Sequence, residues 1–301
     1  MIRVSPLISL VLLGGLFVQF AAANVFAAAD DRETCSRTTG DQAIAACTRL
    51  IESGNFTGAA LAIGYHNRGV EWQNKQQYDL AIIDFDQAIR LNPGFAEAFE
   101  GRGQAHMEKK QYDRAIEDFD HAILLDTNNA NAFNDRGEAY KRMGRYDLAI
   151  ADFTQSIRLN PNYNNLHNRG DAYFKKGQYD LAIIDFDQSI RLNPNFVDAY
   201  NNRGLARMRH GQYEGAIEDF DHAIRIGPSS GAPVYLYNRG LAKGYRGQFD
   251  QALNDFNEAI RLNPSFAQAY FSRGQAKLRL GDKAGGNADM AKGRELDPHV
   301  N

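Results

Sequence analysis

The sequence lacks any long run of acidic or basic residues, and its charges nearly cancel. Its 34 Lys and Arg residues face 37 Asp and Glu residues, which gives a formal net charge of −3. Nucleic acids and anionic membrane surfaces attract clustered basic residues, so neither is expected to be the main partner. With 44% hydrophobic and 24% charged residues, the composition is that of a globular protein.

Catalytic and cofactor motifs are absent as well. The chain contains no G-x-x-x-x-G-K-[ST] loop and no G-x-G-x-x-G at the start of a helix. None of its seven histidines stands in an H-E-x-x-H motif or at the Cys/His spacing of a metal site. We therefore expect a non-enzyme without cofactor, metal or small-molecule substrate. A hydrolase or transferase would need a site that carries none of these motifs.

The N-terminus has the pattern of an export signal. Arg3 precedes an apolar stretch at residues 6–20, and small residues follow, with Ala27 and Ala29 at the small-x-small positions of a cleavage site. The sequence thus predicts that residues 1–29 are a signal peptide and that the mature protein is periplasmic or secreted, with outer-membrane association as one form of this. An uncleaved membrane anchor is the alternative, but the apolar stretch is short for a span.

Only two cysteines are present, Cys35 and Cys47. An even number of cysteines in an exported protein is typical of disulfide bonding. A redox pair is the alternative, and it would normally have the tighter C-x-x-C spacing. We therefore predict a structural disulfide between Cys35 and Cys47.

What the chain does contain is a repeat of 34 residues. The dipeptide Arg-Gly recurs at intervals of 34, 34, 33, 34, 36 and 34 residues, and most copies precede a motif close to A-I-x-D-F-D-x-A-I-R-L-N-P. This pattern resembles the tetratricopeptide repeat, a helix–turn–helix unit. The resemblance implies an all-α solenoid, a right-handed superhelix of stacked helical hairpins. The seven predicted repeats fill residues 62–298 and start at Ala62, Ala96, Ala130, Tyr163, Val197, Pro233 and Ala267.

Two helices per repeat follow from the spacing of the residues. In repeat one, Tyr65, Gly69 and Trp72 share one face of a predicted first helix at residues 62–76. The second helix is predicted to begin at Tyr78, where an acidic residue follows in the first turn. One such hairpin cannot bury its own apolar stripe, so each repeat is expected to pack against its neighbours.

The two ends of the repeat array depart from the pattern. Residues 30–61 align with a shortened repeat, so we predict an N-terminal half-repeat cap that is stapled by the disulfide. In the last repeat, Gly286, Met290 and Gly293 replace the usual Ala, Phe and Ala. This suits a C-terminal cap with no successor, followed by a tail at residues 299–301.

Each repeat carries an Arg on its first helix and an Asp sixteen residues later on its second helix. Pairing within one repeat leaves no member over, whereas pairing with the previous repeat would place Arg68 opposite Ala46. We therefore predict structural ion pairs that fix helix register, and solvated charges kept by duplication are the alternative. The predicted pairs are Arg68–Asp84, Arg102–Asp118, Arg136–Asp152, Arg169–Asp185, Arg203–Asp219, Arg239–Asp255 and Arg273–Asp289.

The resemblance also implies where a partner binds, because family members hold extended peptides against their first helices, on the concave face. At these positions, repeats four to seven carry apolar side chains that the core pattern does not require, which predicts an exposed apolar patch. The alternative is that these side chains contact one another across neighbouring repeats. A recurring Asn resembles the asparagine ladder of O-linked N-acetylglucosamine transferases, which grips a peptide main chain. The predicted peptide-binding residues are Asn168, Phe174, Asn202, Leu205, Met208, Tyr237, Asn238, Leu241, Tyr245, Phe271 and Leu278.

Together these patterns predict a non-catalytic scaffold that binds a protein or peptide partner in the groove of its repeats. The alternative function is a structural or assembly component of the cell envelope or outer membrane, bound through the convex face or the edges of the repeats.

Overall fold

The computed structural model describes residues 30–300, and the predicted signal peptide at residues 1–29 lies outside the described residues. The described residues form helices joined by short loops, with no strand among them, so the predicted all-α class is confirmed. Residues 30–37 are helical and precede α2. The helices that follow are α2 (Gly40–Glu52), α3 (Gly58–Asn74), α4 (Tyr78–Leu91), α5 (Ala96–Glu108), α6 (Tyr112–Leu125), α7 (Ala130–Arg142), α8 (Tyr146–Leu159), α9 (Tyr163–Lys175), α10 (Tyr179–Leu192), α11 (Val197–Arg209), α12 (Tyr213–Ile226), α13 (Ala232–Tyr245), α14 (Phe249–Leu262), α15 (Ala267–Arg279) and α16 (Lys283–Leu296).

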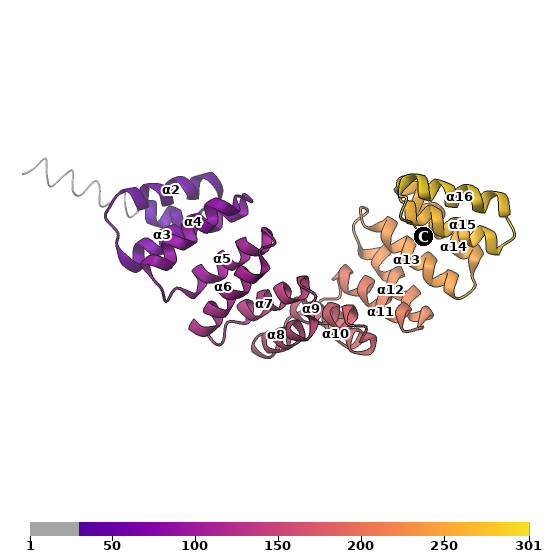
Figure 1. The fold of residues 1–301 in the computed structure, drawn as a ribbon, viewed down its shortest axis with the longest axis horizontal. Helices are drawn as coiled ribbons and strands as arrows, with labels where there is room; N and C mark the ends of the chain where they lie inside the picture. The colour runs from indigo at the N-terminus through magenta and orange to yellow at the C-terminus, as the bar shows by residue number, and fades with distance from the viewer. Residues whose placement is uncertain (1–29, 301) are drawn as a thin grey trace, which may run out of the picture. The chain divides into compact units, whose positions relative to one another are not determined.

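The helices belong to two compact bodies (Figure 1). The N-terminal body contains α2–α7 and ends at Gly144, and the C-terminal body contains α8–α16 and starts at Arg145. Within each body, helices that are consecutive in the sequence lie side by side, and the first helices of successive repeats also touch, as α3 touches α5 and α13 touches α15. This nearest-neighbour packing is that of a solenoid. The handedness predicted for the superhelix concerns the whole chain and stays a prediction.

A left-handed residue follows the first helix of every repeat. In repeats one and two it is Gln76 and Lys110, with φ angles of 59° and 58°. This conformation costs an L residue about 1 kcal/mol, because its Cβ approaches the following carbonyl oxygen. In the later repeats the position is held by glycine, which has no Cβ: Gly144, Gly177, Gly211, Gly247 and Gly281.

The two helices of a repeat approach closely because a glycine of the first helix faces a phenylalanine of the second. A Cβ added to Gly69 would lie 2.9 Å from Cε1 of Phe85, and one added to Gly101 of the next repeat would lie 2.6 Å from Cζ of the same ring. Phe85 is fully buried as a result. One aromatic side chain therefore packs against the first helices of two successive repeats.

The observed first helices start close to the predicted repeat boundaries, with two differences. Helix α3 starts at Gly58, four residues before Ala62, because Ala59, Ala60 and Leu61 are good helix formers. Helix α13 starts one residue before Pro233, which stands in the first turn, where its fixed φ suits a helix.

Both ends of the described chain are closed by short packed segments. Cys35 and Cys47 form a disulfide and are both buried. At the other end, Val300 of the predicted tail is buried against Ala267 and Phe271. Its burial shields the last first helix, α15, from water.

Candidate functional site

The arginines of the repeat motif bind the aspartates of their own repeats. In repeat four, Nε of Arg169 donates to Oδ2 of Asp185 at 2.7 Å, and Nη2 donates to Oδ1 at 2.8 Å. The carboxylate is buried, with 2% of its side chain exposed. Arg136 and Asp152 belong to different bodies, and their pair stays a prediction. The same pairing joins Arg68–Asp84, Arg102–Asp118, Arg203–Asp219, Arg239–Asp255 and Arg273–Asp289.

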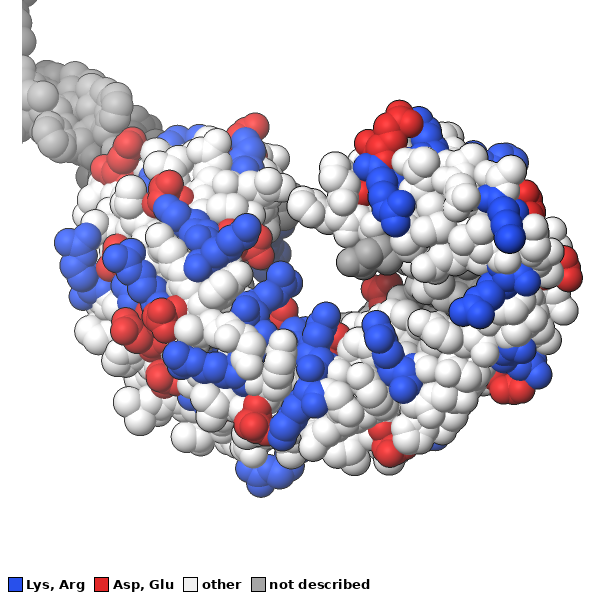
Figure 2. All heavy atoms as spheres, turned by 45° about the vertical axis from the view of Figure 1, so that its right-hand side comes forward, with Lys and Arg blue, Asp and Glu red and all other residues white. Residues whose placement is uncertain are grey.

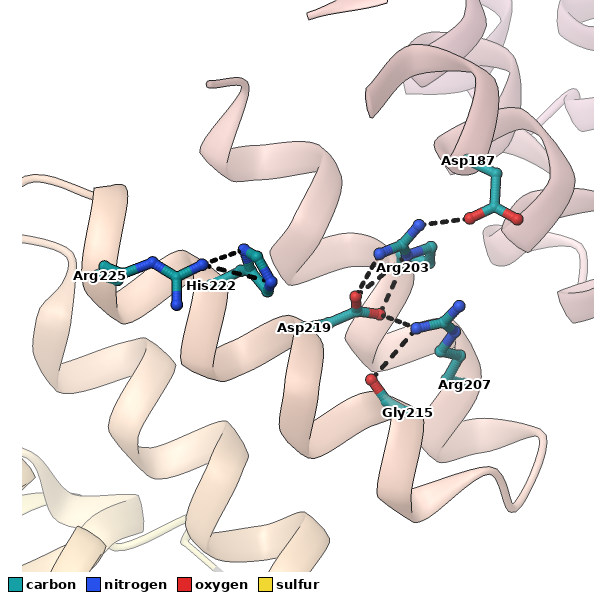
Figure 3. A network of polar contacts seen from close by, with 7 residues as sticks. All are labelled: Asp187, Arg203, Arg207, Gly215, Asp219, His222 and Arg225. Carbon is teal, nitrogen blue, oxygen red and sulfur yellow. Dashed lines mark hydrogen bonds and ion pairs between the residues drawn. The ribbon is translucent and has the colours of Figure 1, made fainter. Parts of the chain in front are cut away.

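Each of these arginines also reaches back to the second helix of the preceding repeat. Arg203 uses Nε and Nη2 for Asp219 and turns Nη1 toward Asp187, which lies sixteen residues earlier (Figure 3). In the same way, Nη1 of Arg102 donates to Oδ1 of Asp86 at 2.5 Å. The counting argument from the sequence allowed one partner only and missed this contact, because the acceptor changes from repeat to repeat among Asp, Asn and Thr.

Many of the buried aspartates receive a second cation from the same first helix. Arg207 donates to Asp219 at 3.0 Å and also to the carbonyl of Gly215 (Figure 3). In the last repeat, burial raises the pKa of Asp289, but hydrogen bonds from Arg273 and Lys277 outweigh this effect, so its pKa is lowered. The arginines thus tie helix to helix and repeat to repeat, and their function is structural.

Two residues predicted for the exposed apolar patch, Met208 and Phe271, are buried, so the patch prediction is wrong for them. Asn238 of the predicted ladder is buried as well. The exposed fractions are 8% for Met208, 7% for Asn238 and 5% for Phe271. Met208 packs with Phe220 and with Ala242 of the next repeat. The reason is the stacking of first helices, which covers the flank that a single repeat would leave open.

The asparagines of the predicted ladder already bind other side chains of the protein. Nδ2 of Asn202 donates to Nε2 of His167 at 3.0 Å, and its Oδ1 accepts from Asn201 at 3.2 Å. Asn238 donates to Oδ1 of Asn201 at 3.0 Å. Asn168 likewise has a partner within the protein. The amides of Asn202 and Asn238 connect neighbouring repeats and are not held open for a peptide main chain.

The remaining predicted residues do present surface. Tyr245 and Leu278 are exposed, at 64% and 37%. Tyr237 is half-buried between the rings of Phe256 and Phe266, and burial raises the pKa of its phenol. Three other predicted residues are also half-buried: Phe174, Leu205 and Leu241.

A cavity of about 680 Å³ opens between α13 and α15, at the C-terminal ends of these helices. Its apolar walls come from Leu241, Phe249, Phe256 and Met290. Its remaining lining includes Gly244, Tyr245, Ser272, Gln275, Ala276, Leu278 and Arg279. The cavity therefore lies among those predicted binding residues that are accessible. We call it, with Tyr245 and Leu278, the α13–α15 site.

Charged side chains lie on the first helices of both bodies. In the N-terminal body, Glu100 and Asp135 lie on α5 and α7, and burial raises the pKa of both carboxyls. In the C-terminal body, Lys175, Arg209 and Arg279 are the last residues of α9, α11 and α15. Figure 2 shows Lys and Arg interspersed with Asp and Glu, without a broad area of one sign.

Among residues 30–300, no group of three or more His, Cys, Asp and Glu side chains is placed to hold a metal ion. In the same part of the chain, no helix has both the length and the apolar character needed to span a bilayer.

Comparison with known proteins gives family matches along most of the described chain. Profiles named "TPR repeat" match residues 103–144, 170–211 and 245–281, and profiles named "Tetratricopeptide repeat" match residues 62–95, 130–163 and 197–230. Together they span more than half of the sequence. No curated protein matches it.

Several solved structures have a similar fold. A tetratricopeptide-repeat protein from Parabacteroides merdae is 19% identical, with a TM-score of 0.62 over 78% of this chain and 93% of its own. YrrB, titled "a TPR protein with an unusual peptide-binding site", is 23% identical, with a TM-score of 0.55 over 63% of this chain and 97% of its own. Pseudomonas aeruginosa pilF is 19% identical, with a TM-score of 0.59 over 67% of this chain and 92% of its own. These likenesses establish the fold.

Proposed function

Because this chain belongs to the tetratricopeptide-repeat family, we propose that it is a non-catalytic scaffold that binds a protein segment. The segment lies along the first helices of the C-terminal body, α9, α11, α13 and α15. The observation that carries this proposal is the α13–α15 site, where a cavity of about 680 Å³ adjoins the exposed Tyr245 and Leu278. Exposed aromatic and large apolar side chains beside a cavity are typical of protein interfaces.

The proposed site of action is outside the cytoplasm, in the periplasm or the medium. A signal-like N-terminus and the disulfide between Cys35 and Cys47 support this, since structural disulfides persist in oxidising compartments. N-terminal sequencing of the protein from fractionated cells tests the proposal. A mature start at or near Asp30 supports export, and an intact Met1 in the cytosolic fraction contradicts it.

Surface substitutions on the first helices test the binding proposal. We expect Tyr245→Ser combined with Leu278→Ser to abolish recovery of a partner crosslinked in the native cell, with the helix content unchanged because both side chains are exposed. The matched control is Leu181→Ser with Ile184→Ser on the second helix α10, where the exposed fractions are 42% and 50%. Retention of the partner by the first pair of substitutions would contradict the proposal.

The exposed residues of α10 also support the alternative function, assembly into the cell envelope or outer membrane through the second helices. Leu80 and Ile83 of α4 occupy the same repeat positions and are 40% and 55% exposed. Under this alternative the control pair on α10 would lose the partner and the first-helix pair would keep it.

A further inference from the structure

We propose that the cavity of the α13–α15 site takes one large apolar side chain of the bound segment, aromatic, Leu or Met, next to an acidic residue of that segment. This inference rests on the proposed function and names the chemistry of its partner. The equivalent cavity between α5 and α7, where Met107 stands in the place of Gly244, measures about 260 Å³. The larger volume of about 680 Å³ at the α13–α15 site goes with the glycine.

Gly244 stands where the preceding repeats carry a large side chain. Phe174 and Met208 occupy this position in repeats four and five. Phe174 of repeat four packs in the cluster that contains Ala206 of repeat five. Met208 of repeat five packs with Ala242 of repeat six. The corresponding cluster around Ala276 has no member from this position. The side chain that Met208 supplies one repeat earlier is missing at Gly244, which widens the cavity.

The backbone gives no reason for a glycine at this position. Gly244 lies inside α13 and has no positive φ, and the left-handed residue that follows the helix is Gly247. A Cβ added to Gly244 would meet no atom within 4 Å. Because glycine lowers helix stability relative to other residues, its presence here is a cost that an open cavity explains.

The walls and the rim of the cavity suit an apolar anchor. The ring of Phe256 and the half-buried Phe249 and Met290 form an apolar lining. Tyr245 at the rim is stacked on Tyr213, with ring centroids 5.5 Å apart and an interplanar angle of 14°. A rim aromatic held in this way contacts a ligand at low entropic cost. The volume lies in the range of ligand pockets, which is about 300–1,000 Å³.

One charge at the rim has no partner within the described part of the chain. Arg279 lines the cavity and is exposed, and residues 30–300 offer it no ion pair. The other cations near the site are used: Lys243 binds Asp255, Arg246 binds Glu214 and Lys277 binds Asp289. An acidic residue beside the apolar anchor of the bound segment would form an ion pair with Arg279.

Selection of peptides on the full chain tests this inference. A library of random 12-residue peptides is selected on the immobilised protein, and the affinities of the enriched peptides are measured by fluorescence anisotropy. We expect enriched peptides to share a large apolar residue with Asp or Glu beside it. Gly244→Met should weaken them at least about tenfold, because the new side chain occupies the cavity and excludes the anchor.

Gly244→Ala is the matched control, since it makes the same improvement to the helix and leaves most of the cavity open. We expect it to bind within about threefold of the natural protein, and neither substitution should lower the thermal midpoint. Arg279→Glu should weaken peptides with the acidic neighbour about fivefold, and should not weaken the same peptides with Asn or Gln in its place.

The outcomes separate this inference from the proposed function. If enriched peptides are weakened by Tyr245→Ser and Leu278→Ser but bind Gly244→Met unchanged, the anchor proposal falls and the first-helix site stands. If no first-helix substitution changes the affinity of the enriched peptides, or if no peptide is enriched, both the anchor proposal and the first-helix binding proposal are contradicted. If indole-3-acetate binds the natural protein and not Gly244→Met while no peptide is enriched, the cavity is a small-molecule site and both proposals are overturned.

Discussion

At the scale of single residues, the repeat motif encodes a fork of hydrogen bonds. The guanidinium of Arg203 joins the buried Asp219 of its own repeat to the half-exposed Asp187 of the preceding one (Figure 3). Exposed fractions of these two carboxylate side chains are 1% and 33%. A buried carboxylate that loses its cation is left uncompensated, whereas an exposed one is re-solvated by water.

This difference predicts two unequal coupling energies. In double-mutant cycles, Arg203→Ala with Asp219→Ala should give a coupling of about 2–3 kcal/mol in the free energy of unfolding. Arg203→Ala with Asp187→Ala should give less than about 1 kcal/mol. Urea unfolding of the natural protein, the three single variants and the two double variants measures both values. Equal couplings, or purely additive losses, would contradict this account of the fork.

The left-handed residues predict a stabilising substitution. Lys110 has a φ of 58°, is exposed and holds the place that glycine takes in the later repeats. Lys110→Gly should therefore raise the free energy of unfolding by about 1 kcal/mol, because the Cβ clash is relieved. The reverse change in the C-terminal body, Gly177→Ala, should lower it by a similar amount. A loss of stability in Lys110→Gly would show that the strain is absent.

A half-buried histidine, His66, predicts a pH dependence of stability. Burial lowers the pKa of His66, and the hydrogen bond to Asn67 and the nearby Glu97 oppose this only in part. The unfolded chain therefore binds the proton more readily, and stability that is present above a pH of about 6.5 is lost as the pH falls toward the lower pKa of the folded protein.

His66→Asn should reduce this loss, since repeats three and five carry Asn at the same position. Thermal midpoints measured at a pH of about 7 and about 5 provide the comparison. Between these two pH values, the thermal midpoint of the natural protein should fall further than that of the His66→Asn variant. Parallel losses in both proteins would assign the pH dependence to other groups.

The residue-scale predictions from sequence succeeded where a pattern recurs and failed where it breaks. Pairing of Arg169 with Asp185 could be predicted by counting, because both members are present in every repeat. The exposure of Met208 could not, because it depends on how closely the next first helix packs, and spacing along one helix carries no information on that distance. Gly244 went unnoticed since a glycine inside a helix has no pattern of its own.

At the scale of the elements, the boundaries of most helices follow from local chemistry. The second helices of repeats one to six begin at an aromatic residue followed by an acidic one, as at Tyr78, and the first helices end before a left-handed residue. The start of α3 at Gly58 could not be placed, because helix propensity alone extends it past the repeat boundary. The N-terminal cap was predicted from an alignment of half a repeat, and the structure buries its two cysteines together.

The disulfide predicts a local change in stability. Replacing Cys35 and Cys47 by Ser should cost about 3 kcal/mol in the chain-entropy account and should loosen residues 30–37 and α2 first. Hydrogen exchange measured by mass spectrometry should become faster in α2 and stay unchanged in α13 to α16, because repeats contact only their neighbours. Equal acceleration in all helices would contradict nearest-neighbour packing.

At the scale of the whole molecule, repetition determines the class of protein, and its interruptions determine the function. The family could be predicted from the 34-residue period, since each hairpin needs its neighbours to bury its apolar stripe. The proposed site lies where the pattern is interrupted, at Gly244 in the first helix of repeat six. The partner itself leaves no signal in a single sequence, because its recognition depends on side chains that vary freely around the shared core.

Photo-crosslinking in the native cell tests the central claim most directly. A benzophenone amino acid is placed at Tyr245 on the first helix α13 or at Ile184 on the second helix α10, two positions that are 64% and 50% exposed. The account predicts a discrete adduct with a protein partner from position 245 and none from position 184. Adducts from position 184 alone would place the partner on the second helices and contradict it.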